Sequence, residues 1–103
     1  MTRIVLLEQS HEETDETREY TDITAQLAED GSVRFLRVDM GPQIETDWDD
    51  YDLEVWFDVS PQDAARALAL ARRIFANPEP SAWSDLIAGL EADGIPVSLE
   101  VWR

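Results

Sequence analysis

Residues 52–75 read DLEVWFDVSPQDAARALALARRIF, and their hydrophobic repeat changes at Ser60-Pro61. Before this point apolar and polar residues alternate, which is typical of a strand with one buried face. After it apolar residues recur every three or four positions, which predicts an amphipathic helix with a Ser cap and a Pro in its first position. We therefore expect a strand at 52–59 that leads directly into a helix ending at Asn77-Pro78.

Towards the N-terminus the sequence predicts three further strands, at residues 3–9, 20–28 and 33–40. The last two are joined by Asp30-Gly31, a dipeptide that is typical of a tight hairpin turn. The polar residues 10–19 are expected to form a turn between the first two strands. This order predicts an antiparallel meander.

Towards the C-terminus, Ser81 is expected to cap a second helix, and Gly94 stands where a helix often ends in a left-handed residue. Residues 97–102 alternate again and predict a last strand, antiparallel to 52–59 because two helices bring the chain back. The predicted fold class is α+β: a five-stranded, largely antiparallel sheet with a two-helix hairpin packed on one face. Its length and apolar content predict a single domain over 1–103.

The charge balance restricts the partners that this chain can have. Its 23 Asp and Glu against 8 basic residues, all Arg, give a formal net charge of −15. Such a field repels nucleic-acid phosphates and anionic membranes, so neither is an expected partner. The absence of cysteine and of a long apolar run favours a cytoplasmic protein. The Arg-only composition suggests a high-GC bacterial genome or adaptation to salt, and the acidity then reflects surface chemistry alone.

Standard catalytic and metal motifs are missing from the sequence. The single histidine, His11, rules out a Ser-His-Asp triad or a two-histidine zinc site and is expected in an exposed loop. The acidic stretch 45–52 lacks calcium-loop spacing, because the sixth position counted from Asp47 is Asp52 where such loops need glycine. We therefore expect no enzyme activity, no catalytic residue, no cofactor and no specific metal site.

The candidate partner-binding site lies on the outward faces of the strands at 52–59 and 97–102. If these strands pair, two tryptophans and several carboxylates share the sheet face away from the helices. Aromatic anchors among charges are a common composition of binding interfaces. The alternative is that both indoles only cover the sheet, packing on each other and on Trp48 or Tyr51, while Trp83 belongs to the core. The predicted site residues are Trp56, Trp102, Glu54, Asp58, Glu100 and Asp52.

Five short motifs resemble the pattern ETREY, DG, D-x-GP, DYEYW and GIP of a family of small acidic bacterial proteins. They are ETREYTD at 16–22, the hairpin at 29–32, DMGP at 39–42, DDYDLEVW at 49–56 and GIP at 94–96. The chain departs from the pattern at Arg37-Val38, where a Glu-Gly step is expected. The resemblance spans nearly the whole chain and implies one domain, but it brings no activity and no functional residues.

Three functions fit these observations. The first is a non-enzymatic binding protein, an inhibitor, immunity-type protein or adaptor that engages a basic protein partner. The second is a DNA mimic that presents carboxylates where phosphates would lie and so blocks a nucleic-acid-binding protein. The third is a structural or housekeeping domain without a dedicated ligand, including a homodimer formed through the tryptophan face.

Overall fold

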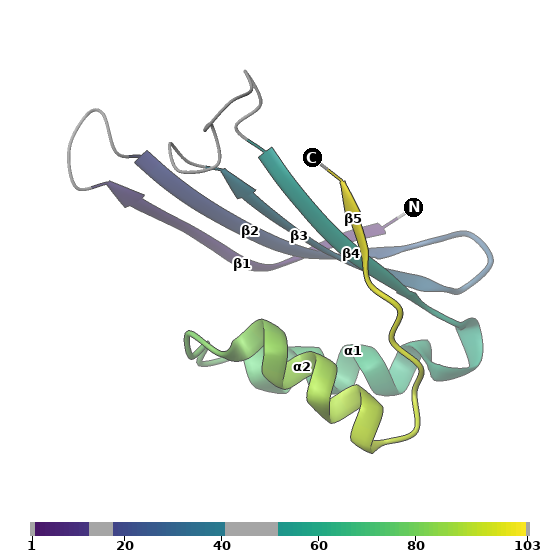
Figure 1. Ribbon diagram of the computed structural model, residues 1–103. Helices are drawn as coiled ribbons and strands as arrows, with labels where there is room; N and C mark the ends of the chain where they lie inside the picture. The colour runs from purple at the N-terminus through teal and green to yellow at the C-terminus, as the bar shows by residue number, and fades with distance from the viewer. Residues whose placement is uncertain (1, 13–17, 41–51, 103) are drawn as a thin grey trace.

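The described part of the chain forms a five-stranded antiparallel sheet with two helices on one face (Figure 1), which confirms the predicted α+β fold. The computed structural model describes residues 2–12, 18–40 and 52–102. The strands lie side by side in chain order, and each pairs with the next in antiparallel fashion. The elements are β1 (Thr2–Glu12), β2 (Arg18–Leu27), β3 (Val33–Met40), β4 (Asp52–Val59), α1 (Pro61–Phe75), α2 (Ala82–Ala92) and β5 (Glu100–Trp102).

The first two strands are longer than the sequence predicts. β1 continues to Glu12 and β2 begins at Arg18, so much of the segment expected to be a turn is paired strand. His11, expected in a loop, lies in β1 opposite Glu19. The prediction failed because it read the polar composition of this stretch as a turn. The backbone register nevertheless pairs the residues of this stretch across the two strands, as it pairs Glu12 with Arg18.

The last strand is shorter than predicted, with three residues where the alternation suggested six. Ile95 is buried, and its backbone N–H donates to the Leu90 carbonyl oxygen at 2.9 Å. This contact holds the chain against the end of α2, so it reaches the sheet edge only at Glu100. Figure 1 shows the segment rising from the helices to the sheet.

The core lies between the helices and one face of the sheet. Phe35 and Phe57 sit opposite each other on β3 and β4, with ring centroids 5.2 Å apart. The Trp83 ring of α2 packs on the Phe57 ring, with centroids 5.5 Å apart, which confirms the predicted place of Trp83 in the core. The buried face of α1 consists mainly of small residues, which lets the helix lie close to its neighbours. These buried residues are Ala64, Ala67, Ala71 and Phe75.

The predicted helix starts and the hairpin are present. Ser60 and Ser81 precede the two helices, although each hydroxyl donates to a carboxylate, of Asp63 and Asp85 respectively, where a capping hydroxyl would accept from a backbone N–H. Gly31 has a φ of 92°, a left-handed conformation that the β2–β3 turn requires. This turn fixes the register of the meander on which the outward face depends.

Candidate functional site

The outward face of the sheet carries the predicted site, and neither helix covers it (Figure 1). Residues directly opposite each other on neighbouring strands point to the same face of a sheet. The register pairs Trp56 of β4 with Glu100 of β5, and Glu54 with Trp102. These four residues, which we call the Trp–Glu patch, therefore alternate as a two-by-two array on adjacent strands.

The two tryptophans differ in exposure. Trp102 leaves 53% of its surface in contact with solvent, whereas Trp56 is partly buried. The register places them diagonally, and among the described residues the aromatic pairs are all in the core. The structure therefore does not support the interpretation that the indoles of Trp56 and Trp102 pack on each other. Trp48 and Tyr51, the other proposed covers, lie outside the described residues.

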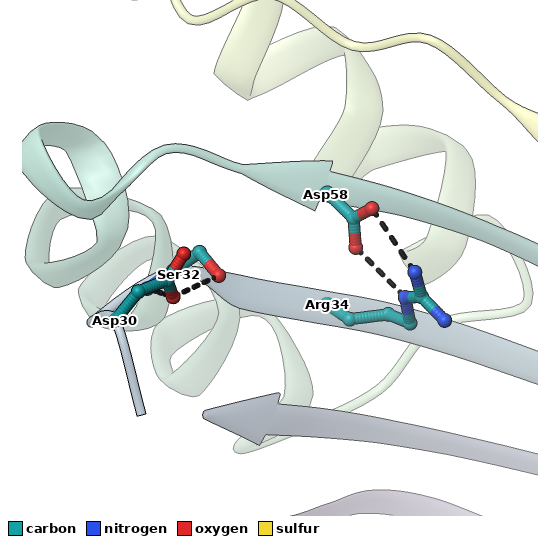
Figure 2. Close-up of polar contacts among 4 residues, drawn as sticks. All are labelled: Asp30, Ser32, Arg34 and Asp58. Atoms are coloured by element: carbon teal, nitrogen blue, oxygen red, sulfur yellow. Dashed lines mark hydrogen bonds and ion pairs between the residues drawn. The ribbon is translucent and has the colours of Figure 1, made fainter. Parts of the chain in front are cut away.

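Asp58, a predicted site residue, is paired within the protein. Arg34 of β3 lies opposite it, and the arginine Nε and Nη2 atoms donate to its two carboxylate oxygens at 2.8 and 3.2 Å (Figure 2). The same carboxylate raises the pKa of Arg34, chiefly through this hydrogen bond. The guanidinium also lies over the Trp56 ring, 5.6 Å from the centroid. Arg34 therefore covers part of Trp56 and neutralises Asp58, which the sequence did not reveal.

The two carboxylates of the Trp–Glu patch have no such counter-charge among the described side chains. Neither Glu54 nor Glu100 forms an ion pair with any residue whose side chain the structure describes. Asp52, the sixth predicted site residue, lies opposite Met40 of β3, beyond the three residues that pair with β5. The structure thus brings together Glu54, Trp56, Glu100 and Trp102 and gives Asp58 a separate role.

Residues of β1 to β3 extend the outward face beyond the predicted site. Leu36 lies opposite Trp56, Thr24 opposite Leu36, and Val5 opposite Thr24, so one row of largely apolar side chains crosses the sheet. Thr24 is 2% exposed even though α1 and α2 lie on the opposite face of the sheet. A second ion pair, between Arg3 and Asp22 at 3.3 Å, lies on the same face. The face is therefore less uniformly acidic than the sequence suggested.

Two polar clusters elsewhere are internally satisfied. On the helix side of the sheet, Asp39 accepts hydrogen bonds from Arg37 at 2.9 Å and from Thr21 at 2.8 Å. Arg37 is the first residue of the Arg37-Val38 step, at which the sequence differs from the motif pattern, and Asp39 neutralises it. In a groove of about 390 Å³ between α1 and α2, Arg66 is held by Asp63 and by Asp93. We therefore regard both clusters as structural.

The described residues give no chemical centre of another kind. They contain no group of three His, Asp or Glu side chains placed to hold a metal ion. Every buried side-chain nitrogen or oxygen in the described ranges has a hydrogen-bond partner. Neither α1 nor α2 has the length and apolar character that crossing a bilayer requires. The acidic stretch tested for calcium spacing lies outside the described residues except for Asp52.

Comparison with known proteins gave no relative: no family model, no curated protein and no solved structure matches this chain. The resemblance to the ETREY family therefore stays a prediction from the motifs. The functional interpretation accordingly begins from the exposed Trp–Glu patch.

Proposed function

We propose that this protein is a non-enzymatic binding protein, of the inhibitor, immunity or adaptor type, that engages a basic protein partner through the Trp–Glu patch. The observation that carries the proposal is the alternation of two indoles with two carboxylates on a sheet face that neither α1 nor α2 covers. The cytoplasm is the compartment that the cysteine-free composition favours.

An exposed indole favours association. Trp102 is about half exposed. Removing on the order of 100 Å² of apolar surface from water contributes roughly 2–3 kcal/mol, before the entropy of association is subtracted. Tryptophan is also among the residue types that most often dominate binding energies. Trp102 is therefore the expected anchor of the interface.

The carboxylates determine the kind of partner. An apolar partner that covered Trp102 would also remove Glu54 and Glu100 from water without a counter-charge, which is strongly unfavourable. A partner with arginine or lysine at these positions avoids that penalty. The net charge of −15 further accelerates encounter with a basic surface.

The DNA-mimic hypothesis has less support on the described face. It requires rows of unneutralised carboxylates at spacings close to those of phosphates. Asp22 and Asp58 are both paired with arginine on this face. A dedicated protein interface is the better interpretation of a surface that mixes ion pairs, indoles and an apolar row.

The test is affinity capture followed by quantitative binding. The immobilised protein captures candidate partners at low and high salt, and each candidate is purified and titrated against the wild type and against Trp102→Ala and Trp56→Ala. We expect a basic partner whose affinity falls with salt and falls at least tenfold in Trp102→Ala, the loss of about 1.4 kcal/mol or more that is expected for an anchor residue.

Glu100→Gln tests the carboxylates of the patch, and Glu8→Gln supplies its matched control. Glu8 is in register with Asp22 on the same face but on the far strand β1, so the substitution changes the charge equally and leaves the patch intact. A captured partner that binds Trp102→Ala as tightly as the wild type contradicts the proposal. Capture of no basic protein at low salt favours the structural or homodimer alternative.

A further inference from the structure

The two edges of the sheet differ in how they resist further pairing. In β1 the register shifts between Val5 and Leu7, and Arg3 and Glu8 add charges along the strand. Bulges and charges at an edge are common devices that prevent a further strand from adding. β5 pairs with β4 in a regular register and presents Glu100 as its one charged residue. The shortness of β5, three residues, limits pairing at its edge, but this edge has no register shift and fewer charges than the β1 edge.

Exposed apolar side chains are concentrated beside this edge. Leu99, Val101 and Trp102 are 48%, 60% and 53% exposed. By register, Val101 lies opposite Val55 on the helix side of the sheet, while Trp102 lies on the outward face. A strand placed along β5 would contact apolar groups on both faces and would also satisfy backbone groups at the open edge.

The charges favour a basic occupant over a second copy of this chain. Two copies would bring together two bodies of net charge −15, with their Glu54 and Glu100 side chains near the shared edge. An arginine beside Glu100 removes that repulsion. β4 already shows the arrangement: Arg34 lies opposite Asp58 and over Trp56, two residues along the same strand. Glu100 and Trp102 have the same spacing on β5.

We propose that the basic partner adds an extended segment along the open edge of β5, with an arginine side chain against Glu100 and Trp102 and an apolar side chain beside Val101. This inference rests on the proposed function and specifies how the same patch is recognised. Backbone hydrogen bonds along the added strand supply affinity, and the alternating side chains supply specificity. Arginine fits better than lysine because its planar group stacks on an indole while it donates to a carboxylate.

The probe is a short, soluble peptide that alternates arginine and valine. Its control has the same sequence with every backbone nitrogen methylated, which retains the charges but prevents strand pairing. A second control replaces arginine by lysine. We expect the unmethylated arginine peptide to bind about tenfold more tightly than the methylated one, as the loss of a few backbone hydrogen bonds implies.

The location of binding is read by amide hydrogen exchange and by matched variants. We expect the peptide to slow exchange in residues 99–102, and we expect Glu100→Gln to weaken binding more than Glu8→Gln at the opposite edge. Light scattering of the protein without peptide measures its oligomeric state and so tests the alternative that a second copy of this chain occupies the edge. A dimer that is lost in Val101→Asp would overturn the proposed occupant in favour of a second copy.

The two proposals fail in different ways. Equal binding of methylated and unmethylated peptides, still weakened by Glu100→Gln or Trp102→Ala, overturns strand addition but supports a basic partner at the patch. If the bound peptide slows amide exchange only in β1, the proposal that it adds to the β5 edge is overturned. Failure of every arginine and lysine peptide to bind at low salt overturns strand addition, whereas capture of no basic protein at low salt is the result that contradicts the basic-partner proposal.

Discussion

The guanidinium of Arg34 lies over the indole of Trp56, 5.6 Å from the ring centroid, and donates at the same time to Asp58. One cation thus satisfies an aromatic face and a carboxylate on the neighbouring strand. The protein therefore contains, between β3 and β4, the type of contact that we propose for its partner at β5.

The Arg34–Asp58 pair is expected to contribute modestly to stability. Both side chains are about half exposed, so solvent screens their attraction. A double-mutant cycle with Arg34→Met and Asp58→Asn should give a coupling energy of about 0.5–1 kcal/mol, measured by urea denaturation. The coupling should fall at high salt. A value that does not change with salt would mean that packing, and not charge, joins the two residues.

The two tryptophans should differ in their effect on folding. Trp56 is partly buried and lies under Arg34, so Trp56→Ala is expected to lower the free energy of unfolding by about 1–2 kcal/mol. Trp102 is half exposed and lies on a short edge strand, and Trp102→Ala should lower the free energy of unfolding by less, about 1 kcal/mol. Denaturation curves of both variants check this. A large loss of stability in Trp102→Ala would show that β5 is needed for the fold.

The hairpin between β2 and β3 predicts a pH effect. The Ser32 hydroxyl donates to Asp30 Oδ1 at 2.7 Å, and the Ser32 backbone N–H donates at 2.9 Å; these bonds hold the pKa of Asp30 below its ordinary value of 3.8. The folded pKa is therefore lower than the unfolded one. The contribution to stability is full above about pH 4 and is lost as the pH falls through the folded pKa.

Replacing the hydroxyl tests this assignment. In Ser32→Ala the backbone donor remains, and we expect the pKa of Asp30 to rise towards 3.8 when the carboxyl group is titrated by NMR. The acid limb of the stability curve should become correspondingly shallower. An unchanged pKa would assign the effect to the backbone bond alone.

The left-handed backbone at the β2–β3 turn is expected to require glycine. Gly31 has a φ of 92°, and an added Cβ would lie 3.4 Å from Pro61 Cβ. We expect Gly31→Ala to destabilise the protein by about 1–2 kcal/mol, most of it from the left-handed backbone. Gly94 has a φ of 77° with nothing within 4 Å of its added Cβ. Gly94→Ala therefore measures the backbone effect alone, and calorimetry of both variants separates the two contributions.

The sequence predicted the fold where two independent signals coincided. At Ser60-Pro61 a change of hydrophobic period met a helix-start signal, and both β4 and α1 follow as expected. At residues 10–19 composition was the only signal, and it could not reveal cross-strand partners. At residues 97–99 the alternation was real, but Ile95 anchors the preceding chain against α2, which is a tertiary effect.

The candidate site was predictable in part. Alternation alone placed Trp56, Glu54 and Asp58 on one face of β4. The partner of Asp58 was not predictable, because residues 33–40 carry apolar side chains on both faces. The β3–β4 register determines which carboxylate Arg34 meets, and the intervening sequence holds no short hairpin signal comparable to Asp30-Gly31.

The one-sided placement of the helices also bears on how such a protein can change over time. Residues that hold the fold, such as Phe35 and Phe57, lie on the helix side, and those proposed to choose a partner lie on the other. Substitutions at Glu100 or Trp102 can thus alter recognition without disturbing the packing of the core. Paralogues with this fold could therefore change specificity by single substitutions at outward-facing strand positions while they retain the same core.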